Sequence, residues 1–81
     1  METRVAVMAI IVENLESAEK INALLHEYSD FIIGRMGIPY KAKSISIMSV
    51  AIDAPQDTVS ALAGKLGSIE GVSVKTACSN V

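Results

Sequence analysis

The sequence has few of the residues that covalent or aromatic stabilisation would require. Its single cysteine, Cys78, excludes an intramolecular disulfide and a CxxC metal or redox motif. Tryptophan is absent, and aromatic residues make up 4% of a chain in which 51% of the residues are hydrophobic. The core must therefore be built from Val, Ile, Leu, Ala and Met. This apolar content is typical of a globular chain and not of a disordered one.

The chain also lacks a strong charge of one sign and a long apolar run. Nine acidic and seven basic residues give a formal net charge of -2, so we expect no direct binding of nucleic acid, which requires a basic face. The apolar stretch Val5–Val12 is far shorter than the roughly 18–20 residues of a membrane span, and the N-terminus is not laid out like a signal peptide. With a single cysteine, these features favour a cytoplasmic protein without a membrane partner.

The length limits how stable an isolated copy can be. With 81 residues, we expect one domain over residues 1–81. A chain of this size buries only about 60–65% of the surface that its unfolded form exposes, so a second copy could add useful stability.

In the first half, β-branched and small apolar residues predict a strand over Arg4–Val12. Asn14 can cap a following helix. Apolar residues then recur at helical spacing on one predicted face: Leu15, Ala18, Ile21, Leu24, Leu25 and Tyr28. Phe31–Met36 is predicted as a second strand interrupted at Gly34, where a glycine suggests a bulge or a close backbone approach. A turn through Gly37, Pro39 and Lys41–Lys43 should follow.

In the second half, Ser44–Ile52 is predicted as a strand because it is rich in β-branched residues. Pro55 is suited to open a second helix, with Val59, Leu62 and Leu66 on its apolar face and Gly67 just past its end. Alternation over Val72–Cys78 predicts a last strand with one wetter face. Cys78 has the same parity as Val72 and Val74, so it is expected on the apolar face of this strand.

The order βαββαβ predicts an α+β ferredoxin-like fold, in which two helices cover one face of a four-stranded antiparallel sheet. The first and third strands are central in that topology, and both carry apolar residues on both faces. Two helices cover only one face, so the other face should be apolar and exposed. We expect a second copy to cover it, in a homodimer or homotetramer.

The most distinctive segment is Gly34–Tyr40. One interpretation is a ligand site in which Arg35 binds an anion and Tyr40 closes the pocket; the other is hairpin geometry with a surface arginine. The turn before the first helix has backbone N–H groups that could hold a carboxylate, although it lacks a glycine. The candidate ligand-binding residues are Glu13, Asn14, Gly34, Arg35, Gly37 and Tyr40.

Metal binding and catalysis have little support. His26 and Cys78 are the only soft-metal ligands, and a closed tetrahedral site takes four, so a metal site would need several copies of the chain. No nucleophile–base pair or phosphate-binding glycine motif is present. We therefore expect no enzyme activity and no cofactor.

Several segments together resemble the family of iron-only hydrogenase system regulators. They span nearly the whole chain, and the Gly34–Tyr40 string is the most specific: Arg4–Val7, Leu25–Tyr28, Ile33–Tyr40, Asp53–Asp57 and Gly71–Thr76. The resemblance implies an ACT-like fold, similar to the C-terminal nickel-sensing domain of the nickel-responsive repressor NikR. Such domains dimerise or tetramerise and bind small effectors at their interfaces.

Two departures limit what the resemblance implies. NikR-type sensing uses several histidines with one cysteine, so His26 and Cys78 alone do not carry nickel sensing over. Typical ACT domains place a glycine after the first strand, where this chain has Glu13, Asn14 and Leu15. Two hypotheses remain: a regulatory domain, acting on transcription or on an enzyme, that self-associates and binds a small anionic effector, or a subunit that assists a metalloenzyme assembly through a protein partner without a ligand of its own.

Overall fold

The computed structural model describes residues 2–81 and has the predicted element order. Its strands and helices are β1 (Arg4–Val12), α1 (Ala18–Glu27), β2 (Ile32–Tyr40), β3 (Ile45–Ala54), α2 (Gln56–Gly67) and β4 (Val72–Cys78). Short 3-10 turns precede α1, follow it, and join β2 to β3. Within this part of the chain, no helix has the length and apolar character needed to cross a membrane.

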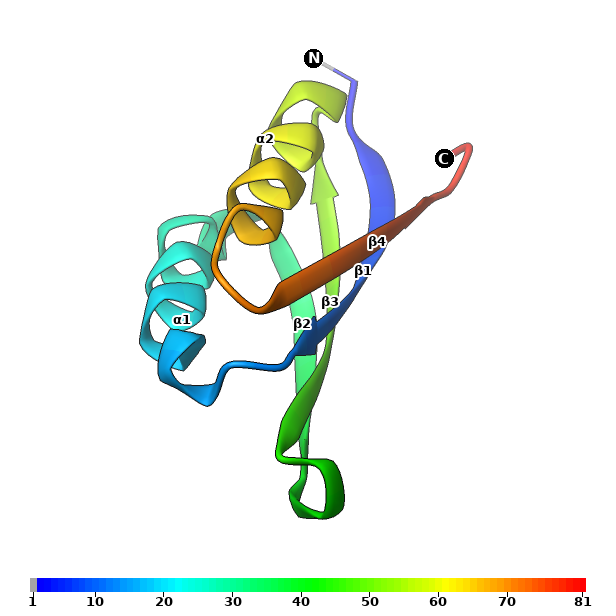
Figure 1. Ribbon diagram of the computed structural model, residues 1–81. Coiled ribbons are helices and arrows are strands. Elements are labelled where there is room, and N and C mark those ends of the chain that lie inside the picture. Colours follow the sequence, from blue (N-terminus) through cyan, green and yellow to red (C-terminus); the bar gives the residue numbers. More distant parts are fainter. Residues whose placement is uncertain (1) are drawn as a thin grey trace.

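The four strands form one antiparallel sheet in the order β2-β3-β1-β4. Both helices lie on the same face of this sheet (Figure 1). The predicted ferredoxin-like fold is therefore confirmed, with β1 and β3 in the centre as expected.

The hydrophobic core lies between the helices and one face of the sheet. Met8 and Ile10 of β1 are fully buried, and their cross-strand neighbours include Val50 on β3. The helices contribute Ile21 and Leu25 from α1 and Val59, Leu62 and Leu66 from α2. These are positions that the helical spacing predicts, so the apolar pattern determines which side of each helix packs on the sheet.

The predicted end of the second strand is wrong. β2 continues through Gly37 and Pro39 to Tyr40, and the chain turns only at Lys41–Lys43, where Ser44 adopts a left-handed conformation with φ of 54°. Proline is tolerated here because β2 is an edge strand, so the missing N–H costs no ladder bond. The result is a long β2–β3 hairpin that projects beyond the helices (Figure 1).

The interruption predicted at Gly34 is a β-bulge directly before it, and this bulge sets the direction of the side chains that follow. Ile32 pairs with Ile52 and Gly34 with Ala51, so Ile33 is an extra residue in β2. A regular ladder would put Arg35 opposite Ser49; the bulge instead puts it opposite Val50, a core residue on the helix side. A shift of one residue reverses every side chain of a strand. The bulge therefore turns Arg35 toward α1.

The turn between β1 and α1 is fixed against the turn before β4. The Asn14 side chain accepts a hydrogen bond of 3.0 Å from the Glu16 N–H and so caps the 3-10 turn Leu15–Ser17 that leads into α1. The Glu13 N–H donates to the Gly71 carbonyl at 2.7 Å, and the buried Ser17 hydroxyl donates to the Glu70 carbonyl at 2.8 Å. Gly71 has φ of +76°, and a Cβ there would lie 2.6 Å from the Asn14 Cβ. Only glycine suits both its conformation and this close approach.

One contact between exposed side chains joins the two helices. Lys65 of α2 donates to the Tyr28 hydroxyl at the end of α1 over 2.9 Å, and its ammonium lies 5.2 Å from the centre of the ring. The hydrogen bond to Tyr28 is the main cause that raises the pKa of Lys65 above 10.5. The contact is open to solvent, so water weakens its contribution to stability.

Candidate functional site

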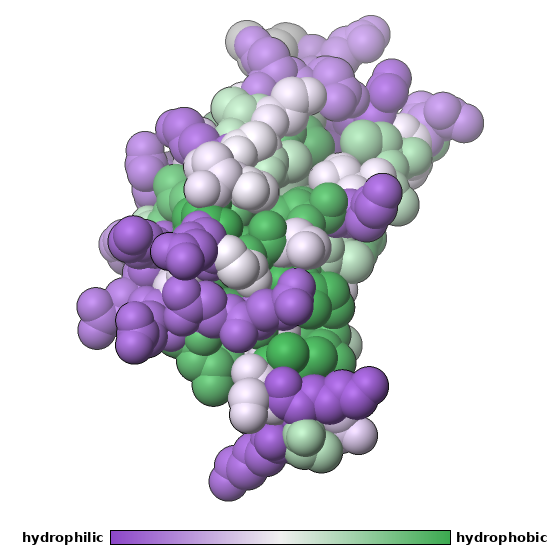
Figure 2. Space-filling view, in the orientation of Figure 1, coloured by the Kyte–Doolittle hydropathy of each residue, from purple (hydrophilic) through white to green (hydrophobic). Residues whose placement is uncertain are grey.

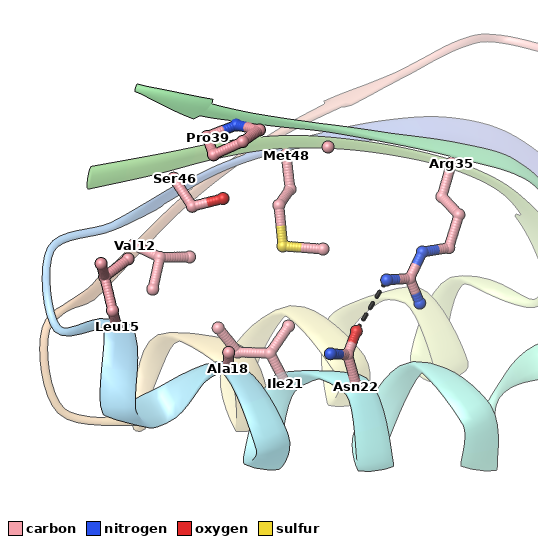
Figure 3. A pocket seen from close by; sticks show the side chains of 10 residues that line it. Val12, Leu15, Ala18, Ile21, Asn22, Arg35, Pro39, Ser46 and Met48 are labelled. Carbon is pink, nitrogen blue, oxygen red and sulfur yellow. Dashed lines mark hydrogen bonds between the residues drawn. The ribbon is translucent and has the colours of Figure 1, made fainter. Parts of the chain in front are cut away.

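A pocket of about 290 Å³ lies between the start of α1 and the inner face of the β2–β3 hairpin (Figure 3). Its lining comes from β1, the turn after it, α1, β2 and β3: Val12, Leu15, Ala18, Ile21, Asn22, Arg35, Gly37, Pro39, Ser46 and Met48. Most of these side chains are apolar. Pockets of this size are at the lower end of the range that small-molecule ligands occupy.

The pocket exists because the 3-10 turn before α1 and the start of α1 face small residues of the hairpin. Leu15 and Ala18 belong to the predicted apolar face, yet Leu15 is 54% exposed. The hairpin residues above them include Gly37 and Pro39, and a Cβ at Gly37 would meet no atom within 4 Å. Figure 2 shows the resulting apolar surface, over the strands between α1 and the tip of the hairpin. Apolar side chains are thus left accessible at the wall of a cavity.

One end of the pocket carries a positive charge. Arg35 points from β2 toward α1, where its guanidinium donates a hydrogen bond of 2.7 Å to the Asn22 side-chain oxygen (Figure 3). This partner is a neutral amide, so the contact orients the guanidinium without neutralising its charge. The chain between Asp30 and Asp53 contains no acidic residue but includes Lys41 and Lys43 as well as Arg35. The charge at this end of the pocket suits an anion.

The structure brings two of the six predicted ligand-binding residues to this pocket, Arg35 and Gly37. Glu13 and Asn14 lie outside its lining. The Glu13 N–H and the Asn14 side chain are instead engaged in fixing the turn. Gly34 and Tyr40 pair with Ala51 and Ile45 on the sheet face that the helices do not cover. A ligand-binding role for any of the six stays a prediction.

Sequence reasoning missed two residues that complete the pocket, Asn22 and Met48. Asn22 lies on the predicted polar side of the first helix, where an amide carries no distinguishing signal. Met48 packs partly against the core and also lines the pocket, and its cross-strand partner Gly37 has no side chain to cover it. The bulge at Gly34, which indicates that Arg35 changes face, was the signal that could have located the site.

The two soft-metal ligands lie apart in the fold. His26 is in the last turn of α1 and Cys78 is at the end of β4, where its side chain is exposed. Within residues 2–81, no three His, Cys, Asp or Glu side chains gather in a group that could hold a metal ion.

The second feature of interest is the sheet face opposite the helices, here called the open sheet face. Its large apolar side chains are Val7, Ile11, Met36, Ile38, Tyr40 and Ile47. Met36 is 60% exposed and Ile38 is 49% exposed. Across the centre of this face, Met36, Ser49 and Ala9 lie side by side, and a charge enters the row only at Lys75 on β4. A second charge on this face, Asp53, lies near the end of β3 where it pairs with Val5, so the open sheet face is apolar at its centre.

Comparison with solved structures finds a similar protein that matches this chain over nearly its whole length. Protein TM1266 from Thermotoga maritima has 36% sequence identity and a TM-score of 0.91, over 95% of this chain and 98% of that one. No curated protein sequence matches significantly.

Two more distant structures share the fold alone. A formyltetrahydrofolate deformylase from Pseudomonas putida has a TM-score of 0.68 at 11% identity, over 95% of this chain and 29% of the enzyme. A nitrogen regulatory PII-like protein from Thiomonas intermedia, determined with ADP, AMP and bicarbonate, has a TM-score of 0.53 at 14% identity, over 99% and 100% of the two chains. A shared fold at such low identity does not transfer an activity.

The family comparison agrees with the resemblance that the sequence motifs indicated. The matched segment runs from residue 4 to residue 76, from the start of β1 into β4, and includes every residue of the pocket. The chain belongs to the TM1266-like family of iron-only hydrogenase system regulators.

Proposed function

We propose that this protein is a non-enzymatic regulatory domain that self-associates through the open sheet face and responds to a small anionic effector. Membership of a regulator family supports a regulatory role. The observation that carries the proposal is the exposure of Val7, Met36, Ile38 and Tyr40, which are 43%, 60%, 49% and 46% exposed on one continuous face. A patch of this kind on a small protein usually marks an interface.

A second copy of the same chain is the occupant that this face suits best. A symmetric pair would place the same apolar rows against each other, so that the interface buries no charge at its centre. Because Lys75 is near the edge of the patch, it could stay in contact with water. The short chain has a small core of its own, so burying this face would add stability that an isolated copy lacks.

Sedimentation velocity over a range of protein concentrations tests the self-association. We expect the wild type to sediment as a dimer or tetramer, and Ile38→Asp to sediment as a folded monomer because it places a charge within the apolar patch of the interface. Ala61→Asp, at an exposed position of α2, introduces the same charge away from the open sheet face and should leave the assembly unchanged. A wild type that stays monomeric at high concentration would contradict the proposal.

Thermal unfolding against amino acids, organic acids, nucleotides and divalent metals tests the response to an effector. A ligand at 100 times its dissociation constant should add about 2.7 kcal/mol of stability. If no compound shifts the unfolding temperature and the wild type is monomeric, the same apolar face would instead support the second candidate. That candidate is a subunit that docks on a protein of a metalloenzyme system.

A further inference from the structure

We infer that the pocket between α1 and the β2–β3 hairpin binds an aliphatic monocarboxylate, with its carboxylate on Arg35 and its hydrocarbon tail along Leu15, Ala18 and Met48. This inference rests on the proposed regulatory function and names the effector class and its site. It places the site within a single copy of the chain and on the helix side of the sheet.

The tail is argued from the apolar wall. Leu15 is 54% exposed, and it lies at the end of the pocket farthest from Arg35 (Figure 3). Met48 points into the space from β3, and Ile21 and Val12 close the base. Each methylene buried there contributes about 0.8 kcal/mol. Met48 is unbranched and flexible, so it can adjust to tails of different shape.

The head group is argued from the way Arg35 is held. Its guanidinium has five N–H donors, and the hydrogen bond to the Asn22 side-chain oxygen fixes its direction at 2.7 Å. The remaining donors can take both oxygens of a carboxylate, which is the strongest pairing of a guanidinium with a planar anion. The pocket provides one cation, so it matches an acid with one negative charge.

The absence of a side chain at position 37 makes room for the ligand. A Cβ at Gly37 would meet nothing within 4 Å, and the residue faces the pocket opposite Met48. A leucine at this position would be accepted by the strand and would fill the space that the tail needs. Gly37→Leu is therefore a variant that should keep the fold and remove the site.

Octanoate is a suitable probe, and methionine methyl groups labelled with carbon-13 report where it binds. Met48 lines the pocket, whereas Met36 lies on the open sheet face, so one NMR titration separates the two surfaces. We expect octanoate to shift the Met48 methyl signal in a saturable way, with little effect on Met36. Octan-1-ol should bind at least about tenfold more weakly because it lacks the charge, and acetate should bind more weakly because it lacks the tail.

Three variants complete the test. Arg35→Gln should weaken octanoate about tenfold or more, whereas Lys43→Gln removes the same charge from the hairpin tip and should change little. Gly37→Leu should abolish binding while its circular dichroism spectrum and unfolding temperature show a folded protein. Three outcomes would overturn the inference. Arg35→Gln could bind octanoate as tightly as the wild type does, the wild type could bind octan-1-ol as tightly as octanoate, or octanoate could shift only the Met36 signal.

The inference and the proposed function can fail separately. Octanoate binding at Met48 in a protein that sediments as a monomer would leave the site standing without the proposed self-association. Conversely, a stable oligomer whose Met48 signal does not move with millimolar octanoate would retain the regulatory proposal and reject the carboxylate site.

Discussion

Gly71 offers a sharp test of the packing that fixes the start of α1. Its φ of +76° is a conformation that costs an alanine roughly 1–2 kcal/mol. The new methyl group would also lie 2.6 Å from the Asn14 Cβ and 2.9 Å from the Asn14 backbone nitrogen. Both atoms belong to a turn that is held by the 2.7 Å hydrogen bond from the Glu13 N–H to the Gly71 carbonyl, so relief of the clash breaks that bond.

These two effects together should lower the free energy of unfolding of Gly71→Ala by about 2–4 kcal/mol. In a domain of this size, such a loss corresponds to an unfolding temperature lower by on the order of 10–30 °C. Differential scanning calorimetry and urea unfolding at one fixed protein concentration would measure both quantities. The fixed concentration matters because any self-association contributes to the apparent stability.

Gly64→Ala is the matched control, because it makes the same chemical change in the interior of α2, where a Cβ meets no atom within 4 Å. It should raise stability by about 0.5–1 kcal/mol, since alanine is a better helix former than glycine. If Gly71→Ala unfolds within about 0.5 kcal/mol of the wild type, the close approach does not constrain the turn and the reasoning is refuted.

Two further predictions concern the segments that flank α1. Asn14→Ala removes the cap on the Glu16 N–H and should cost about 1 kcal/mol in urea unfolding, and an unchanged midpoint would contradict that role. Tyr28→Phe removes the main cause of the raised Lys65 pKa, so NMR titration of the lysine side chain should give a pKa closer to 10.5. Because the folded-state pKa is raised, the stabilisation from this contact is present below pH 10.5 and is lost as the pH rises through the folded-state value. An unchanged Lys65 pKa in the variant would show that the tyrosine hydroxyl is not its cause.

The sequence was sufficient for the fold because local patterns and global topology agree. β-branched runs predict the bounds Arg4–Val12 of β1 and Val72–Cys78 of β4 as the structure has them. The apolar spacing in both helices identifies the buried side correctly. The error fell on β2, where Gly37 and Pro39 are typical of turns. Edge position is a tertiary property, and it is what allows a proline to stay in the strand.

The site was harder to predict because it depends on the register of a single strand. Arg35 is a correct candidate, but its face follows from the extra residue Ile33, which alternation alone does not reveal. The sequence predicts Tyr40 in the same pocket as Arg35, but the structure has it on the other face of the sheet. Tyr40 lies five positions after Arg35 in β2, and an odd separation along a strand puts two side chains on opposite faces. Leu15 and Ala18 fit the core pattern so well that nothing in the sequence distinguishes a pocket wall from a packed interior.

The outer half of the β2–β3 hairpin is a single layer of protein. From Ile33 to Ser44 every residue is exposed, and beyond the helices the two strands are held by their mutual backbone hydrogen bonds. Segments with so little buried apolar surface open at a small fraction of the global unfolding free energy. Amide hydrogens of this arm should therefore exchange with solvent far faster than those of the β1–β3 pair at the centre of the sheet. Any molecule that binds against either side of the arm would slow that exchange. The exchange rate of the hairpin amides therefore reports whether the pocket or the open sheet face is occupied.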